Sequence, residues 1–150
     1  MGGTQAHGEF TIQRHSAAGQ PGAVALAAHG LNVQPRRMGP LIDLLTANGI
    51  EVVSIALHGH GENYVRKPEL TEAEARLESL RSVTYRLWCD EFRAAYCVAA
   101  LRAEQLGGVP LHLLGYSLGG LIGCDLLARA ADVHFDRMVL FAPALRIRLL

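Results

Sequence analysis

The chain has 150 residues, half of them hydrophobic, and its basic and acidic side chains balance to a formal net charge of zero. This length suits one domain with a substantial core, and the neutral balance gives no indication of binding to nucleic acid or to an anionic membrane surface. Residues 1–9 lack the apolar core of a signal peptide, and no apolar run approaches the roughly 20 residues of a transmembrane segment.

The three cysteines are an odd number and show neither disulfide nor metal-binding spacing. Cys89, Cys97 and Cys124 all fall in stretches that predict helices. We therefore expect reduced, buried thiols and a cytoplasmic protein.

The first half of the chain predicts strands around a helix. Residues 10–15 alternate apolar and polar side chains, which is typical of a half-buried strand near a sheet edge. The apolar runs at 23–28 and 51–57 are typical of strands buried on both faces of a parallel sheet, and a right-handed crossover would make them parallel. Between them, residues 38–48 predict an amphipathic helix. Its apolar face consists of Leu41, Leu44 and Leu45.

The second half of the chain predicts further helices and strands. Thr71 and Glu74 have the spacing of a capping box, which opens a helix. Residues 85–106 predict a long helix whose apolar face packs into the core. The remaining predicted elements are a strand at 111–114, a helix at 118–131 and a strand at 138–142. The chain thus predicts an α/β fold with three layers, α/β/α, around a mostly parallel sheet.

A tight turn, Gly115-Tyr116-Ser117-Leu118-Gly119, joins the strand at 111–114 to the helix that follows. A serine at the tip of such a turn takes strained backbone angles, and glycines two residues away on either side let the strand and helix approach. Its hydroxyl lies close to the first NH groups of the helix, where an oxyanion can be stabilised. The pattern predicts a nucleophilic serine; the alternative is a glycine-rich strand end with an incidental serine.

The order of these motifs resembles the α/β-hydrolase superfamily, and within it the monoacylglycerol lipase, lysophospholipase and serine aminopeptidase group. The resemblance spans residues 23–144 and rests on His29-Gly30-Leu31 after one strand, Gly59-His60-Gly61 after the next, and the serine turn extended to Gly120. Relatives commonly carry Asp, Arg and Ser where this chain has Ala56, His58 and Asn63.

The resemblance implies a serine hydrolase that needs no cofactor or metal and acts on a small-molecule acyl ester, lipid-like or otherwise apolar. Ser117 would attack the acyl carbon, and the backbone NH groups of Leu31 and Leu118 would form the oxyanion hole. Structural support would come from His29, Gly30, Gly115 and Gly119.

The family places the triad acid and histidine after the nucleophile, and only residues 118–150 follow it here. Asp125 falls inside a predicted helix, whereas Asp132, His134 and Asp136 precede the last strand, at the opposite end of the sheet from the serine. We therefore expect residues 1–150 to be the amino-terminal portion of a single α/β-hydrolase domain, incomplete at its carboxyl end and catalytically weak alone.

Two of the histidines have a spacing that also occurs in metal sites. His58 and His60 form an H-x-H loop, a pattern also found in binuclear metallohydrolases, but Glu62-Asn63 replaces the expected Asp-His, so a structural turn is favoured over a zinc site. His112 is predicted to pack in the sheet. The histidines expected at the surface are His7, His15 and His134.

The missing triad leaves two further functions open. The chain could be a non-catalytic binding domain, because the fold does not by itself guarantee an activity. It could also be an acyltransferase or thioesterase that uses Ser117.

Overall fold

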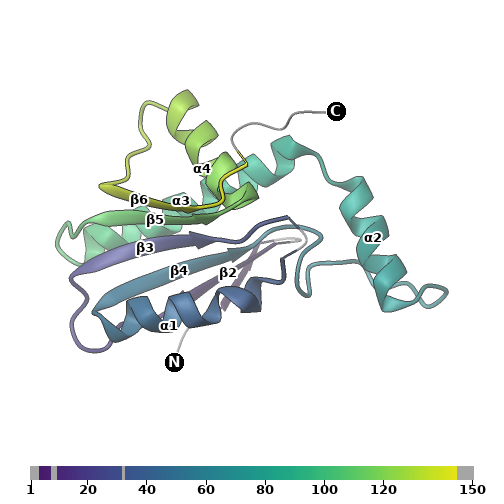
Figure 1. Cartoon of the computed structure of the whole chain (residues 1–150), viewed down its shortest axis with the longest axis horizontal. Helices are drawn as coiled ribbons and strands as arrows, with labels where there is room; N and C mark the ends of the chain where they lie inside the picture. The colour runs from purple at the N-terminus through teal and green to yellow at the C-terminus, as the bar shows by residue number, and fades with distance from the viewer. Residues whose placement is uncertain (1–3, 8–9, 32, 145–150) are drawn as a thin grey trace.

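The computed structural model describes residues 4–7, 10–31 and 33–144, and its centre is one sheet with strand order β1-β2-β4-β3-β5-β6 (Figure 1). The strands are β1 (Thr4–His7), β2 (Phe10–His15), β3 (Ala23–Ala28), β4 (Ile50–Ala56), β5 (Leu111–Tyr116) and β6 (Arg137–Phe141). β3, β4, β5 and β6 run parallel, whereas β1 and β2 pair antiparallel. The predicted α/β class with a mostly parallel sheet is confirmed.

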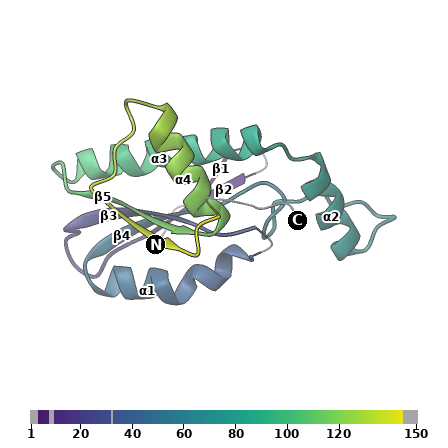
Figure 2. The same ribbon diagram turned by 45° about the horizontal axis from the view of Figure 1, so that its top comes forward.

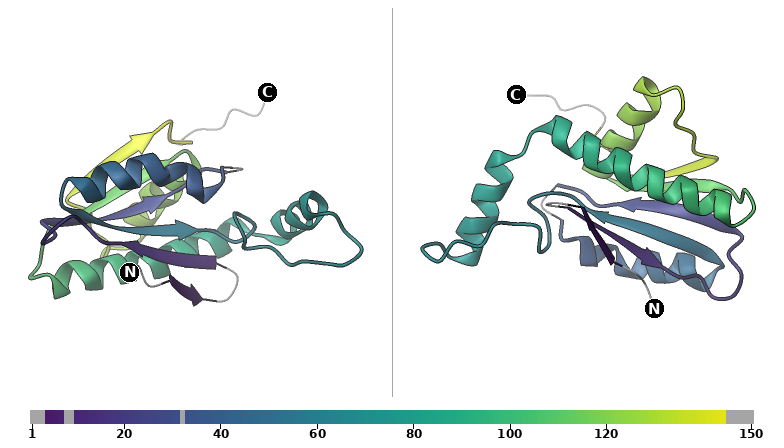
Figure 3. Two further views of the ribbon diagram at one scale, coloured as in Figure 1. Left: turned by 90° about the horizontal axis from the view of Figure 1, so that it is seen from below. Right: turned by 180° about the vertical axis from the view of Figure 1, so that it is seen from behind.

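Helices cover both faces of this sheet: α1 lies on one face, and α3 and α4 lie on the other (Figure 2). The helices are the short 3₁₀ helix η1 (Pro35–Met38), α1 (Gly39–Ala47), α2 (Glu72–Ser82), α3 (Tyr85–Gln105) and α4 (Leu118–Arg129). Helix α2 projects away from the sheet (Figure 3). None of these helices in the described part of the chain is long and apolar enough to cross a membrane.

The core is organised around β3, whose six residues are all buried. Val24 and Leu26 belong to the cluster on the α3 face, together with Phe92, which is fully buried. Ala25 and Ala27 point the other way and belong to the cluster under α1. Because side chains alternate along a strand, large residues fill one face of β3 while alanines on the other leave room for α1 to lie close.

The helix predicted at 38–48 forms as η1 followed by α1, but its buried face differs from the expected one. Met38 and Ile42 are buried, Leu41 and Leu45 are half-buried, and Leu44 is 60% exposed. The expectation that Leu44 faces the core is wrong. The inward residues follow the i, i+3, i+4, i+7 spacing of one helix face, and Leu44 lies two positions after Ile42, on the other side of the helix.

Capping side chains start the two helices of the middle segment. Thr71 and Glu74 form the predicted capping box at the start of α2. At the start of α3, the Thr84 hydroxyl accepts a hydrogen bond from the NH of Leu87. Each contact satisfies an NH group that has no carbonyl partner within its own helix, and such caps contribute about 1 kcal/mol to stability.

The structure differs from the sequence analysis in two further respects. Strand β1 was not anticipated; it pairs with β2, which lies one strand in from the edge and so near it, as predicted. The expectation of buried thiols fails for Cys97, which is exposed on α3, whereas Cys89 and Cys124 are half-buried. An amphipathic helix presents some small side chains to solvent, and Cys97 falls on that side of α3.

Candidate active site

Ser117 lies between β5 and α4 in a strained conformation, with φ 47° and ψ −106°. Few residues with a side chain adopt such angles, and their cost of about 1–3 kcal/mol is borne by the surrounding structure. Its NH donates to the Phe141 carbonyl at 2.9 Å, and its carbonyl accepts from the NH of Ala144 at 3.3 Å. Ala142, between these two partners, also has a positive φ, 43°. The end of β6 therefore helps to hold the turn.

Close backbone approaches explain the two glycines around Ser117. A Cβ atom on Gly119 would lie 2.4 Å from the Ala28 carbonyl oxygen, and one on Gly115 would lie 2.7 Å from the Gly120 Cα. The helix thus starts directly against the end of β3, where the NH of Gly119 donates to the His29 carbonyl at 3.1 Å. Only glycine fits at either position without moving backbone atoms.

The loop after β3 lies directly beside Ser117. A Cβ atom on Gly30 would lie 2.7 Å from the Tyr116 ring and 3.2 Å from the Ser117 Cβ. Leu31 follows, with its side chain 48% exposed, and the NH of Val33 donates to the Gly30 carbonyl at 3.2 Å. The peptide unit between Gly30 and Leu31 is therefore a neighbour of the serine.

The NH of Leu118 is suited to bind an anion because of its place in α4. Leu118 is the first residue of α4, so its NH has no carbonyl partner within that helix. The helix dipole adds a partial positive charge at the same end. The NH of Leu118 therefore lies at the positive end of α4, next to Ser117.

His29 is fully buried and its ring is held on both nitrogens. The NH of Leu57 donates to Nε2 at 3.1 Å, so Nδ1 carries the proton and donates to the Gly30 carbonyl at 2.9 Å. Burial lowers the pKa of His29 to about 4, partly offset by the Gly30 hydrogen bond. The ring is neutral at pH 7 and fixed in place, an arrangement that fits structural support and not proton transfer to Ser117.

His58 and His60 are also buried, in the loop after β4. The His58 NH donates to the Glu91 carboxylate at 2.9 Å, and the indole NH of Trp88 donates to the His58 carbonyl at 3.0 Å. Among the described residues, no group of three or more His, Cys, Asp or Glu side chains is arranged to hold a metal ion. Trp88 and Glu91 were not singled out from the sequence, because helix periodicity assigned this face of α3 to the core.

The acidic residues and the histidine that follow Ser117 in the sequence make their contacts with other parts of the structure. The Asp136 carboxylate accepts from the NH of Leu111, the first residue of β5, whereas Ser117 follows the last residue of the same strand. His134 lies beside Asp136, with 3.5 Å between Nε2 and the carboxylate. Asp125 pairs with Arg129 on the surface of α4. These contacts place His134 and Asp136 at the opposite end of β5 from Ser117.

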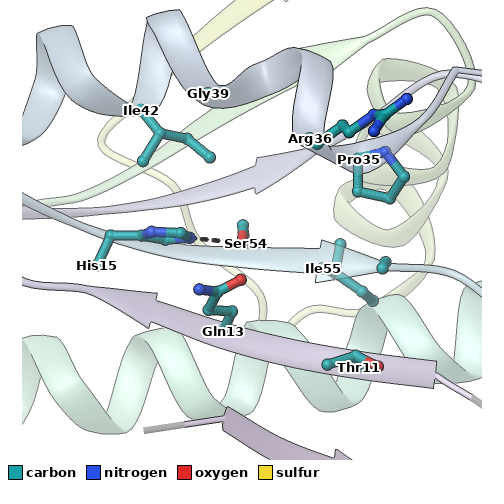
Figure 4. A pocket seen from close by; sticks show the side chains of 10 residues that line it. Thr11, Gln13, His15, Pro35, Arg36, Gly39, Ile42, Ser54 and Ile55 are labelled. Atoms are coloured by element: carbon teal, nitrogen blue, oxygen red, sulfur yellow. Dashed lines mark hydrogen bonds between the residues drawn. The ribbon is translucent and has the colours of Figure 1, made fainter. Parts of the chain in front are cut away.

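A hollow of about 190 Å³ lies on the α1 face of the sheet, and Ser117 is not among the residues that line it (Figure 4). Its polar lining includes Ser54 on β4 and His15 on β2. The Ser54 Oγ and the His15 Nε2 atoms are 2.9 Å apart.

The predictions for the remaining histidines have mixed outcomes. His15 was expected at the surface but is half-buried, whereas His134 is exposed, as expected. The side chain of His7 lies outside the described residues. The His112 Nδ1 atom is buried without a hydrogen-bond partner among the described residues.

Comparisons with known proteins identify the family and the fold. The family model for serine aminopeptidase, S33, matches residues 19–150. A carboxyl esterase from Bacillus coagulans, solved with glycerol, is 15% identical with a TM-score of 0.69 over 93% of this chain and 43% of its own. A monoglyceride lipase from Saccharomyces cerevisiae, solved with a substrate analogue, is 14% identical with a TM-score of 0.71 over 92% of this chain and 43% of its own.

A thioesterase domain from the curacin biosynthetic pathway is 20% identical, with a TM-score of 0.56 over 89% of this chain and 41% of its own. A search of curated protein sequences finds no significant match. The chain spans less than half the length of these three solved structures. Because the family model covers most of the chain, the protein belongs to the serine aminopeptidase S33 family of α/β hydrolases.

Proposed function

We propose that the protein is a serine hydrolase that cleaves carboxylic esters, lipid-like or otherwise apolar, through an acyl-enzyme on Ser117. The observation that carries this proposal is the strained Ser117 at the start of α4, with Gly30 packed against it. A packing role alone gives no reason to keep a strained serine at a helix start beside a second loop. Membership of a hydrolase family supports the same conclusion.

In the proposed reaction the Ser117 Oγ attacks the ester carbonyl carbon while its proton passes to a general base. The carbonyl oxygen becomes an oxyanion, stabilised by the NH groups of Leu31 and Leu118. The carbon–oxygen bond to the alcohol then breaks, the alcohol leaves with the proton, and the acyl group stays on Ser117. Water hydrolyses this acyl-enzyme by the same steps. Each oxyanion donor is expected to lower the barrier by about 3 kcal/mol.

We further propose that the base and its acid partner come from residues outside 1–150. In the described part of the chain, the positions of His134 and Asp136 beside the start of β5 support this proposal. Residues 1–150 would then form the amino-terminal portion of a single α/β-hydrolase domain. Alone, they should keep only about 10³-fold acceleration over water, because an oxyanion hole without a base is a weak catalyst.

The experiment that tests the function uses the product of the complete reading frame and p-nitrophenyl esters of several acyl lengths. Ser117→Ala should lower kcat by roughly 10⁶-fold and abolish labelling by a fluorophosphonate. Ser54→Ala is the matched control, because Ser54 has a histidine nitrogen beside its hydroxyl but lies on an ordinary strand. It should label and turn over ester like the wild type. Turnover that survives Ser117→Ala would refute the proposal.

Two competing functions have distinct signatures in the same assay. A non-catalytic binding domain is favoured by the remoteness of His134 and Asp136, and it would give no turnover in wild type or variant. A thioesterase or acyltransferase would use Ser117 as well, and the fold shared with the curacin pathway thioesterase domain supports testing thioesters and alcohol acceptors beside oxygen esters.

A further inference from the structure

Helix α3 holds both backbone polar groups of His58, in the loop that follows β4. The Glu91 carboxylate accepts from the His58 NH at 2.9 Å, and the Trp88 indole NH donates to the His58 carbonyl at 3.0 Å. Trp88 and Glu91 are three residues apart, so they share one face of the helix. Glu91 is only 4% exposed, and burying a carboxylate costs stability unless it is hydrogen-bonded. These two side chains fix the loop to α3.

The ring of His60 connects this loop to His29. Its centroid lies 5.7 Å from that of Trp88 and 4.5 Å from that of His29, and its Nδ1 donates to the His58 carbonyl at 3.2 Å. His60 is 4% exposed, so the ring has little freedom to leave this position. The Trp88, His60 and His29 side chains therefore form a continuous packed row from α3 to the end of β3.

His29 carries the connection to the peptide beside Ser117. Its ring accepts from the NH of Leu57 in the β4 loop and donates to the Gly30 carbonyl. The Gly30 carbonyl and the Leu31 NH belong to one planar trans peptide unit and point in opposite directions. Any rotation of that carbonyl rotates the Leu31 NH by the same angle. The His29 ring therefore fixes the direction of this NH.

We propose that Trp88 and Glu91 are positioning residues, which hold the NH of Leu31 in place for the oxyanion by way of the β4 loop, His60 and His29. The inference rests on the proposed function, because it concerns the same oxyanion hole. Burial keeps the pKa of His60 low, as it does that of His29, so both rings are neutral at pH 7 and the row stays intact. Glu91 is the carboxylate that hydrogen-bonds this loop from α3.

The first test compares Trp88→Phe with Tyr96→Phe in the product of the complete reading frame. Trp88→Phe keeps an aromatic ring against His60 but removes the indole donor. Tyr96 is the matched control: it lies on the same helix, is buried, and hydrogen-bonds the NH of His134 at 3.0 Å, far from Ser117. We expect Trp88→Phe to lower kcat about tenfold or more with KM nearly unchanged, because a misplaced donor weakens only the transition state. Tyr96→Phe should leave kcat unchanged.

Glu91 is tested by a conservative rescue. Glu91→Ala removes the acceptor of the His58 NH and should lower kcat by a similar factor, whereas Glu91→Gln keeps an acceptor oxygen and should recover most of the activity. Failure of glutamine to rescue would overturn the hydrogen-bonding role of Glu91. Unchanged kcat in Trp88→Phe, or an equal loss in Tyr96→Phe, would overturn the inference as a whole.

A second readout is independent of turnover. The backbone amide resonance of Leu31 and the ring resonances of His29 should shift in Trp88→Phe and stay in place in Tyr96→Phe. Shifts in a protein whose wild type has no esterase activity would reject the proposed function while keeping the coupling. Unmoved resonances would reject the coupling even if ester turnover at Ser117 is established.

Discussion

The backbone of Ser117 makes the proposed nucleophile a source of instability, and this can be measured. At φ 47° and ψ −106° a side chain is strained, whereas glycine adopts such angles freely. Ser117→Gly should therefore be about 1 kcal/mol more stable than Ser117→Ala, because both lose the hydroxyl but only glycine relieves the strain. Urea denaturation of the two variants measures the difference, and equal midpoints would show that the turn is relaxed.

Gly119 should be intolerant of any side chain. A Cβ atom there meets the Ala28 carbonyl carbon and oxygen, which are backbone atoms that cannot rotate away. Gly119→Ala should cost about 2–3 kcal/mol in unfolding free energy, as overpacking typically does. Gly22→Ala is the control, since a Cβ there meets nothing within 4 Å and φ lies outside the left-handed region. Equal denaturation midpoints for the two variants would contradict the close approach.

The buried neutral His29 predicts loss of stability in acid. Its pKa in the fold is about 4, below the ordinary 6.5, so between these values the unfolded chain binds a proton that the folded protein excludes. The contribution is complete above pH 6.5 and decreases as the pH falls towards 4, by about 3 kcal/mol in total. Comparing the unfolding free energy of wild type and His29→Gln across this window isolates the effect. If the unfolding free energies of the two proteins depend on pH in the same way, His29 does not contribute to the loss of stability in acid.

At the scale of elements, Glu51 connects three of them. Its carboxylate on β4 is 3% exposed and pairs with Arg14 on β2 and Arg102 on α3, at 2.9 and 2.7 Å. Burial raises the pKa of Glu51, but the hydrogen bonds from Arg102 and Arg14 outweigh it and the net pKa is lowered. The ion network therefore stabilises the fold above the ordinary glutamate pKa and is lost as the pH falls below it.

Removing this carboxylate should be costly. Glu51→Ala leaves two arginines without their shared partner in a half-buried site, and we expect a loss of about 3 kcal/mol in unfolding free energy. Asp132→Ala removes the partner of Arg93 in an exposed pair and should cost far less. Thermal unfolding of both variants provides the comparison, and similar Tm values would mean that Glu51 is not held as the contacts indicate.

The elements that could be predicted from the sequence are those whose local residue pattern alone determines their structure. The apolar run of β3, the capping box of α2 and the glycines around Ser117 each have one strong local cause, and the structure contains all three features. Leu44 was misassigned because the leucines alone were followed, whereas the i, i+3, i+4, i+7 face consists of Met38, Leu41, Ile42 and Leu45. The packing of α1 against the sheet decides which side of the helix is buried.

The candidate site also has one part that the sequence could predict and one part that it could not. Ser117 and Gly30 could be placed side by side from motifs, because both follow parallel strands that end at the same edge of the sheet. The contacts of Trp88 and Glu91 with His58 could not, because they join residues thirty or more positions apart through side chains that a helix pattern assigns to the core. Long-range polar contacts leave no local trace in the sequence.

At the scale of the whole molecule, one part of the sheet surface is open. Val139 and Phe141 on β6 and Tyr116 on β5 are 50%, 39% and 37% exposed. Their strand register places them on the same face as Leu114, which packs under α1, but they lie beyond the reach of that helix. In the described part of the chain β6 is also an edge strand, so its outer backbone groups face no neighbouring strand. Such surfaces favour association with another polypeptide segment.

If residues 1–150 are the amino-terminal portion of one domain, further chain should cover this surface. Residues 1–150 alone should then self-associate at micromolar concentrations, and Val139→Lys should weaken that association at least severalfold, because a charge at the edge of a sheet opposes pairing. Leu101→Lys is the control: Leu101 is 56% exposed on α3, on the opposite face of the sheet. Sedimentation velocity of the two variants, and of the product of the complete reading frame, measures association directly. A monomeric chain 1–150, or equal effects of both lysines, would show that this face is stable in water and would remove the support that the open face gives to a domain continuing past β6.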